Sequence, residues 1–210
     1  MRKIGLGRTG EELVAVLINE KLDKLLETTS RSFYPTLKYL PKKVRGQIGL
    51  LYLLARLADT IADSKHGEAD ILLELLAKYN DVAQGRETAL PDFSELAEIQ
   101  TNPSEAELLL NAEDVIQGLQ EYDEGDQKRI LECLEVIVGG QILDLHRFGT
   151  AMEGGGISSL TSDEELDDYT YRVAGCVGTF WSKMSLAHLM TLSPEKEKIF
   201  LEKGIRFGKA

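Results

Sequence analysis

The feature that most constrains the fold is an almost wholly apolar run, residues 49–58, that ends in two aspartates. The run reads Gly-Leu-Leu-Tyr-Leu-Leu-Ala-Arg-Leu-Ala, and Asp59 and Asp63 follow it. Apolar residues on nearly every face predict a helix that is buried inside the protein. The two carboxylates share one face at the C-terminal end, where the helix dipole disfavours anions. A bound cation would remove most of the cost of burying them.

One stripe of this predicted helix carries the groups that could form a site. At steps of four, three and four residues it presents Tyr52, Arg56, Asp59 and Asp63. Oxygen ligands at this spacing suit Mg²⁺, which takes one or two carboxylates and leaves other positions to water and substrate phosphate. Arg56 would complement the remaining phosphate oxygens. The alternative is an internal Arg56–Asp59 ion pair, but one arginine cannot neutralise both acids.

Helix signals recur along the chain and strand signals are scarce, so the sequence predicts a single all-α domain over residues 1–210. The expected helices cover residues 9–27, 33–40, 41–64, 68–82, 102–122, 126–148, 162–192 and 194–210. Three capping boxes support these boundaries: Thr9 with Glu12, Asn102 with Glu105, and Ser162 with Glu165. Residues 28–32 are expected to be a polar turn, and 85–101 a loop with at most one helical turn.

Composition and charge narrow the class of protein. The 210 residues are 43% hydrophobic, which allows one domain with an ample core. The net charge of −11, without a basic stripe, argues against nucleic acid as a partner. Cys133 and Cys176 lie in apolar helical contexts and are predicted to be reduced packing residues of a cytoplasmic protein. The sequence shows neither a signal peptide pattern nor a run of 18 apolar residues.

Three further segments could carry chemistry. Residues 29–33, Thr-Ser-Arg-Ser-Phe, place hydroxyls around an arginine just before a helix. They form either a phosphate cradle or an N-cap beside a solvated arginine. Residues 168–178, Asp-Tyr-Thr-Tyr-Arg-Val-Ala-Gly-Cys-Val-Gly, begin an apolar stripe of Tyr169, Val173, Val177 and Phe180. The glycines of this segment, and those of residues 139–144, permit close approach by a neighbouring helix or by a ligand.

Together these segments resemble the squalene/phytoene synthase family, head-to-head prenyl synthases with the all-α isoprenoid synthase fold around a central apolar cavity. The resemblance runs from Thr28 to the C-terminus. It is most specific in Ser-Arg-Ser-Phe at residues 30–33, in residues 52–63, and in Tyr-x-x-x-Val-Ala-Gly-x-Val-Gly at residues 169–178. The Asp-Thr-x-x-Asp form of the acidic motif favours the squalene synthase branch.

The resemblance implies a role for each matched residue. Asp59 and Asp63 would bind Mg²⁺ that bridges to diphosphate, and Tyr169 would handle protons in the first half-reaction. Arg31 and Arg56 match arginines that contact diphosphate or the phosphates of NADPH. The other matches are expected to line the substrate cavity and its prenyl tunnel: Ser30, Ser32, Phe33, Tyr52, Val173 and Val177.

The implied reaction joins two farnesyl diphosphate molecules through presqualene diphosphate and reduces the product to squalene with NADPH. Two alternatives stay open: a phytoene or dehydrosqualene synthase without the reduction, and a non-catalytic prenyl-diphosphate-binding module. The family also carries a second aspartate-rich motif, which its pattern would place soon after Ala210. The sequence therefore looks like the N-terminal part of a synthase, with the last helices missing. Because the product is a lipid, peripheral membrane contact is expected.

Overall fold

Helices make up all the regular structure in the part of the chain that the computed structural model describes, residues 19–64, 69–154 and 159–210. The helices are α1 (Glu20–Ser30), α2 (Phe33–Tyr39), α3 (Lys42–Ala62), α4 (Ala69–Ala83), α5 (Ser94–Glu98), α6 (Pro103–Leu110), α7 (Ala112–Gln117), η1 (Gly118–Glu121), α8 (Glu124–Gly154), α9 (Asp163–Thr170), η2 (Tyr171–Gly175), α10 (Cys176–His188) and α11 (Pro194–Lys209). The all-α prediction is confirmed. None of these helices combines the length and apolarity that crossing a lipid bilayer requires.

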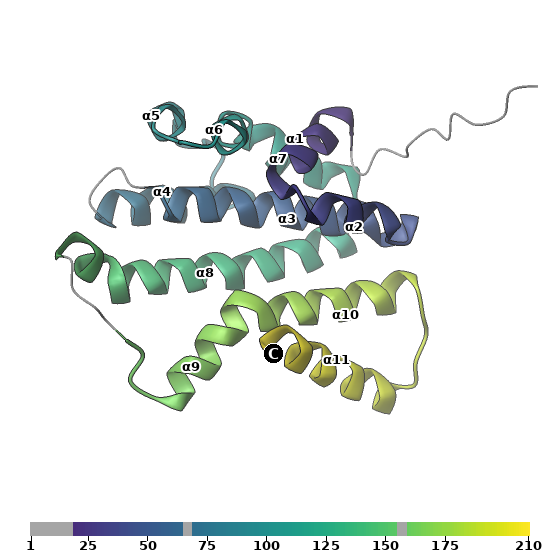
Figure 1. The fold of residues 1–210 in the computed structure, drawn as a ribbon. Helices are drawn as coiled ribbons and strands as arrows, with labels where there is room; N and C mark the ends of the chain where they lie inside the picture. The colour runs from purple at the N-terminus through teal and green to yellow at the C-terminus, as the bar shows by residue number, and fades with distance from the viewer. Residues whose placement is uncertain (1–18, 65–68, 155–158) are drawn as a thin grey trace, which may run out of the picture.

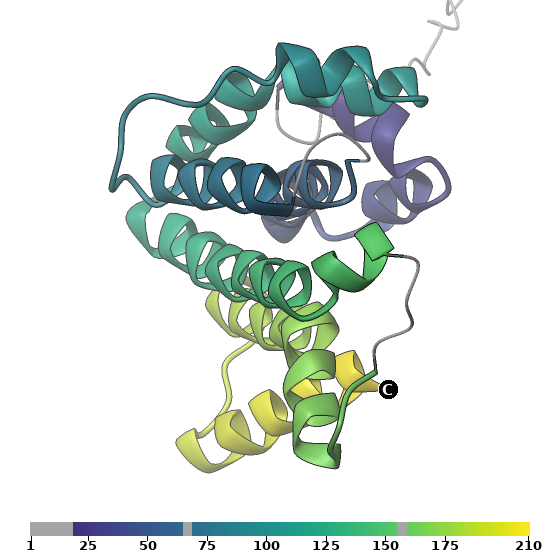
Figure 2. The same cartoon turned by 90° about the vertical axis from the view of Figure 1, so that its left-hand side faces the viewer.

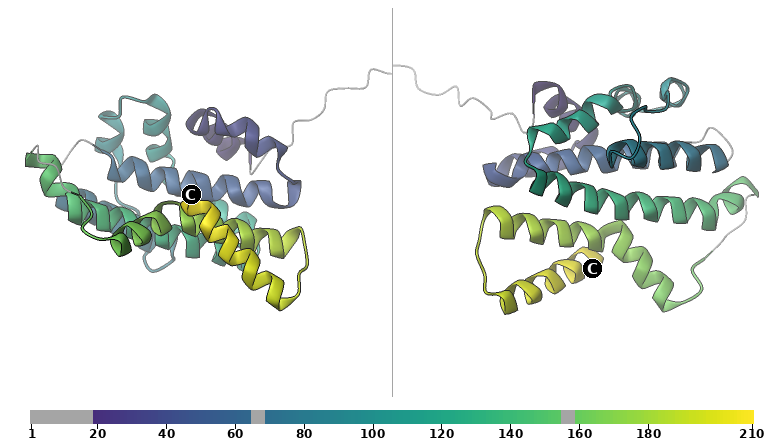
Figure 3. Two further views of the ribbon diagram at one scale, coloured as in Figure 1. Left: turned by 60° about the horizontal axis from the view of Figure 1, so that its bottom comes forward. Right: turned by 180° about the vertical axis from the view of Figure 1, so that it is seen from behind.

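The helices form layers around α3 and α8 (Figure 1). Helices α1, α6 and α7 pack on one side of α3, and α8 packs against α3, α4 and α10. Figures 2 and 3 show α8 between the α3–α4 layer and the layer of α9, α10 and α11. The C-terminus returns to the junction of α9 and α10, because α11 packs against η2 and α10.

Helix α3 is the centre of the core, as its apolar sequence predicts. Leu50, Leu53, Leu54 and Leu57 have no exposed surface. Each such side chain contributes about 1.5–3 kcal/mol by its burial. The hydroxyl of the fully buried Tyr79 donates to the backbone oxygen of Leu54 at 2.9 Å, which fastens α4 to α3. The face left out of this core is the stripe that carries Arg56 and the two aspartates.

A buried polar cluster ties three helices together at the other end of α3. Asp126, at the start of α8, is 2% exposed and accepts hydrogen bonds from three side chains. Gln47 of α3 donates at 2.8 Å, Arg129 of α8 lies at 2.9 Å, and His188 of α10 lies at 2.8 Å. Burial by itself raises the pKa of Asp126, but these bonds, first those of His188 and Gln47, outweigh burial and lower it.

The predicted helix 9–27 is wrong at both of the boundaries that can be compared. Helix α1 begins only at Glu20, because Asn19 is extended and caps it by accepting from the backbone nitrogen of Leu22 at 2.9 Å. Helix α1 continues to Ser30, so the polar turn expected over residues 28–32 is wrong for its first three residues. The hydroxyls of Thr28, Thr29 and Ser30 bond back to carbonyls three or four residues earlier, which lets these residues stay helical. The predicted start at Thr9 and Glu12 lies outside the described residues.

Two predicted helices are interrupted. The helix expected over 102–122 breaks at Asn111, whose side-chain amide donates to the backbone oxygen of Glu107 at 2.7 Å and ends α6. The helix expected over 162–192 contains the π-helical segment η2, whose wider turn changes the phase of the side chains. Val173 is therefore 53% exposed while Phe180 is 2% exposed, so the predicted four-residue stripe does not hold together.

The glycines predicted to permit close approach are contacted by neighbouring helices. A Cβ added at Gly140 would lie 2.9 Å from Cβ of Arg172, so η2 packs directly on α8. At Gly178 an added Cβ would lie 2.0 Å from the backbone oxygen of Gly204, where α10 and α11 cross. The structure thus supports the helix-packing interpretation of these glycines.

Candidate functional site

The outward face of α3 forms a polar site together with α6. The Arg56 guanidinium does not make the internal pair with Asp59 that we considered as the alternative. Its Nη2 pairs with Oε1 of Glu105 on α6, and the Asn102 side chain donates to the same oxygen at 2.9 Å. Glu105 therefore holds Arg56 instead of closing the predicted capping box. Asn102 still caps α6, because its side chain accepts from the backbone nitrogen of Ser104 at 3.1 Å.

Asp59 is directed toward α8. Its Oδ1 accepts a hydrogen bond from Nε2 of Gln141. Burial raises the pKa of Asp59, the charge of Arg56 lowers it, and the charge of Asp63 raises it, with a net increase. A half-buried carboxylate of this kind is more stable with a cation beside it than without one.

Two buried polar atoms at this site lack a partner. Among the described residues, Nε of Arg56 and Oε1 of Gln141 are buried without any hydrogen bond. Such groups cost about 1–3 kcal/mol each when they stay unsatisfied. Nε of Arg56 is a donor suited to a phosphate oxygen. Oε1 of Gln141 is an acceptor suited to a cation or its bound water. The site is thus incomplete in a way that a cation–phosphate ligand would complete.

A cavity of about 200 Å³ opens beside the Arg56–Glu105 pair. Arg56, Thr60, Asp63, Gln100 and Glu105 contribute polar groups to its lining. Its volume is below the roughly 300–1,000 Å³ of sites for drug-sized ligands, so it could hold a small polar group but not a long apolar chain.

The donor set at this site fits Mg²⁺ held jointly with a substrate better than a metal held by protein alone. In the ranges that the structure describes, no group of three or more His, Cys, Asp or Glu side chains is arranged to hold a metal ion. Asp59 and Asp63 supply two carboxylates on one helix face. The prediction that both are buried is wrong for Asp63, which is exposed because it lies at the C-terminal end of α3. Mg²⁺ typically binds through one or two carboxylates and completes its shell with water and substrate phosphate.

An aromatic pair lies next to the site. The rings of Phe33 and Tyr52 have centroids 5.5 Å apart, and Tyr52 Oη lies 3.5 Å from the backbone oxygen of Thr29. Burial raises the pKa of Tyr52, while the charges of Arg56 and Arg31 lower it. The effect of burial is larger, so the pKa of Tyr52 is raised overall. The structure thus brings the predicted residues Phe33 and Tyr52 into contact, close enough to Arg56 and Arg31 for their charges to act on Tyr52.

The two serines of the predicted phosphate cradle differ in solvent exposure and in hydrogen bonding. Ser30 is buried, and its hydroxyl donates to the backbone oxygen of Leu26 at 2.5 Å, so its proton is already used. Ser32 is exposed at the start of α2 and makes no capping bond there. Arg31 between them adopts a positive φ of 45°, which ends α1 and turns the chain into α2. Arg31 and Ser32 remain available to a ligand, but the hydroxyl proton of Ser30 does not.

The predicted tunnel residues line a groove between α10 and α11. Val173 and Val177 border it together with Trp181, Phe200 and Phe207, and its volume is about 770 Å³. The groove is large enough for an apolar chain. Tyr169 is half-buried on α9, and Figures 1 and 2 show α8 between α9 and α3. Helix α9, which carries Tyr169, and helix α3, which carries Asp59, are therefore on opposite sides of α8.

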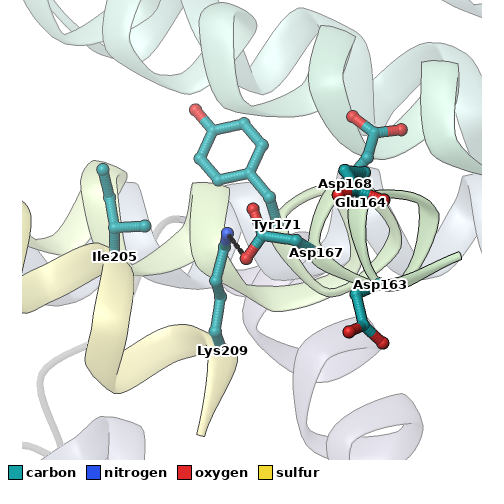
Figure 4. Close-up of a pocket in the computed structure, with 7 residues that line it drawn as sticks. All are labelled: Asp163, Glu164, Asp167, Asp168, Tyr171, Ile205 and Lys209. Atoms are coloured by element: carbon teal, nitrogen blue, oxygen red, sulfur yellow. Dashed lines mark hydrogen bonds and ion pairs between the residues drawn. The ribbon is translucent and has the colours of Figure 1, made fainter.

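A separate acidic cavity of about 640 Å³ lies between α9 and α11 (Figure 4). Its lining residues are Asp163, Glu164, Asp167, Asp168, Tyr171, Ile205 and Lys209. Nζ of Lys209 pairs with Asp167 at 2.6 Å and lies 5.7 Å from the centroid of the Tyr171 ring. The acids occupy the first turns of α9, where Ser162 caps the helix by accepting from Glu165 at 3.2 Å. The helix dipole favours acidic side chains near a helix N-terminus, and this stabilisation explains why acids are concentrated at the start of α9.

Sequence reasoning missed Glu105 and Gln141 as site residues. Glu105 had been assigned to a capping box, and Gln141 appeared only as a neighbour of two glycines. The polarity of Gln141 within the otherwise apolar stretch 136–143 is the signal in the sequence that points to it. The same segment contains Asp144, which is half-buried, and burial raises its pKa while the charge of Arg147 lowers it.

Comparisons with known proteins bear on the family and the fold. The sequence model of the family described as squalene/phytoene synthase matches residues 26–210. Two solved structures, complexes of TcSQS with the ligands E5700 and BPH1237, superpose with TM-scores of 0.66 and 0.67 at 19% sequence identity. The matches cover 90% and 91% of this chain but only 50% and 51% of the solved chains. This likeness shows a shared isoprenoid synthase fold. No curated protein sequence gives a significant match.

Proposed function

The chain belongs to the squalene/phytoene synthase family, and we propose that it serves the head-to-head condensation of two farnesyl diphosphate molecules, through presqualene diphosphate, to squalene. The observation that carries this proposal is the incomplete polar site on α3. Arg56 has an unpartnered donor, and Gln141, which donates to Asp59, has an unpartnered acceptor. A diphosphate with its cation offers the complementary acceptor and positive charge.

The diphosphate would bind first to Arg56, whose orientation Glu105 fixes. Asp59 and Asp63 would hold Mg²⁺, which when bound neutralises charge on the diphosphate leaving group. Gln141 keeps Asp59 directed toward the site by donating to its Oδ1. Loss of the diphosphate leaves an allylic cation, and these charged groups favour that step because negative charge develops on the leaving group.

Apolar and aromatic side chains would protect the allylic cation from water. Phe33 and Tyr52 lie next to the polar site, and Val173 and Val177 border the groove where we propose that a prenyl chain lies. We propose that Tyr169 handles the proton lost when the cyclopropyl intermediate forms. NADPH would supply hydride for the reduction to squalene, with Arg31 and Arg56 contacting its phosphates. The influence of both arginines on Tyr52 supports their acting on one ligand.

A binding experiment tests the metal–diphosphate site directly. Asp59→Asn combined with Asp63→Asn should abolish the Mg²⁺-dependent part of farnesyl diphosphate binding, measured by isothermal titration calorimetry with and without the metal. The matched control is Asp163→Asn combined with Asp167→Asn, which removes two acids at the same spacing from α9. Equal affinity in the site variant and the control would refute the proposed site.

Product analysis separates the reactions that the family performs. Incubation with farnesyl diphosphate and Mg²⁺ should give squalene only when NADPH is present. A C30 product that lacks the reduction under both conditions would favour a dehydrosqualene-type reaction, and longer prenyl substrates would test a phytoene synthase. Tight Mg²⁺-dependent binding without any product would instead support the non-catalytic binding module.

A further inference from the structure

Two thiols meet on the side of α8 that faces α10. Cys133 of α8 and Cys176 at the start of α10 are both free, and they are 5% and 3% exposed. Both line a cavity of about 340 Å³ that lies between the two helices, together with Arg129, Thr179 and Lys183. A water molecule takes about 30 Å³, so the cavity can admit a small oxidant up to the sulfur atoms.

Cys133 and Cys176 lie on two helices, α8 and α10, that pack against each other. Sγ of Cys176 donates to the backbone oxygen of Arg172 at 3.1 Å, so its own proton is committed. Across the contact between α8 and α10, each of the two thiols shifts the pKa of the other. The close packing of Arg172 on Gly140 fixes the start of α10 on α8 and keeps the thiols together.

This arrangement makes the two thiols chemically different. The hydrogen bond from Cys133 lowers the pKa of Cys176, against the effect of burial, and backbone amides of residues 176 and 177 lower it further. The same hydrogen bond, together with burial, raises the pKa of Cys133. Cys176 thus forms a thiolate more readily, and Cys133 keeps its proton. A pair of this kind is typical of a reacting thiol and a resolving thiol.

We propose that Cys133 and Cys176 form a reversible disulfide when a peroxide enters the cavity between α8 and α10. The Cys176 thiolate attacks one peroxide oxygen, the O–O bond breaks, and a sulfenic acid and hydroxide result. The Cys133 sulfur then attacks the Cys176 sulfur, the S–O bond breaks, and a second hydroxide leaves. The two thiol protons convert both hydroxides to water, so hydrogen peroxide gains two electrons and the dithiol loses two. The disulfide fixes α10, which carries Val177 and Trp181 of the apolar groove, to α8.

The test treats the folded protein with hydrogen peroxide and maps its cysteines by mass spectrometry without reduction. We expect a cross-linked peptide pair containing Cys133 and Cys176, a mass loss of about 2 Da, and reversal by dithiothreitol. Closing a loop of this length should raise the melting temperature by about 5–10 °C. In Cys133→Ala, the oxidation should stop at a sulfenic acid on Cys176 that dimedone traps. In Cys176→Ala, Cys133 should stay unoxidised over the same time.

The result that would overturn the proposal is a folded protein that keeps both thiols at a peroxide concentration that oxidises free glutathione. A cross-link that appears only after unfolding in urea would overturn it as well. Circular dichroism checks that each variant is folded, and Cys133→Ser replaces Cys133→Ala if the alanine variant is not. None of these measurements depends on prenyl diphosphate binding, so the outcome is independent of the proposed function.

Discussion

Gln141→Leu separates the role of Gln141 at the site from its role in stability. The amide makes one hydrogen bond to the Asp59 carboxylate, worth about 1.5–3 kcal/mol because the acceptor is charged. Its other polar atom, Oε1, is buried without a partner, which costs about 1–3 kcal/mol. Leucine is close to glutamine in size and removes both effects. The free energy of unfolding should therefore change by less than about 1 kcal/mol.

Binding should respond differently, because only the hydrogen bond acts on Asp59. Loss of a group that orients a metal ligand typically weakens metal binding about 10–100-fold. Without Gln141 the carboxylate also loses an interaction that lowers its pKa, so protonation competes more strongly with the metal. We expect Mg²⁺-dependent farnesyl diphosphate binding to weaken by at least about tenfold near neutral pH.

The assay compares two quantities in the same variant, the urea-unfolding free energy and the calorimetric affinity for farnesyl diphosphate with Mg²⁺. Gln84→Leu is the matched control, because the Gln84 amide is also half-buried and donates at 3.0 Å, but to the backbone oxygen of Leu131. The control should leave the affinity unchanged. The reasoning is refuted if Gln141→Leu binds as tightly as the wild type, or if both variants lose affinity equally.

Two further predictions concern stability. Asp126→Ala leaves His188, Arg129 and the buried Gln47 without their shared partner and should cost about 3–5 kcal/mol in urea unfolding at pH 7. Because the pKa of Asp126 is lowered in the folded protein, its contribution is present above the unfolded value of about 3.9 and is lost as the pH falls through the folded value. The gap between variant and wild type should therefore shrink below about pH 4, and a constant gap would contradict the assignment. Gly178→Ala puts a Cβ 2.0 Å from the Gly204 oxygen, so α10 and α11 must separate at a cost of about 1–3 kcal/mol by calorimetry. Gly85→Ala cannot serve as the control for Gly178→Ala, because alanine would be strained at the positive φ of 72° of Gly85. Ala83→Gly at the end of α4 is used instead, because it exchanges the same two residue types at a position that is not part of the crossing of α10 and α11.

Local patterns were enough to predict the helices and one face of the site. The apolar run, its closing aspartates and the caps at Asn102 and Ser162 depend on residues within one or two turns of each other. The stripe of Tyr52, Arg56, Asp59 and Asp63 follows from the helical period alone. For the same reason the sequence could predict that Arg31 precedes a helix beginning at Phe33, although it could not show that the Phe33 ring lies against Tyr52.

Tertiary packing decided which partners these side chains have. The sequence offered Arg56 an acid three residues away, but α6 brings Glu105 against it, and α8 brings Gln141 against Asp59. These residues are 49 and 82 positions from their partners, so no helical period relates them. The π-helical segment η2 likewise contains Val173, which is 53% exposed, whereas Phe180 in the α-helix that follows is 2% exposed. The sequence by itself determined one charged face of α3, and only the packing of α6 and α8 on that face made it a site with an unpartnered donor and an unpartnered acceptor.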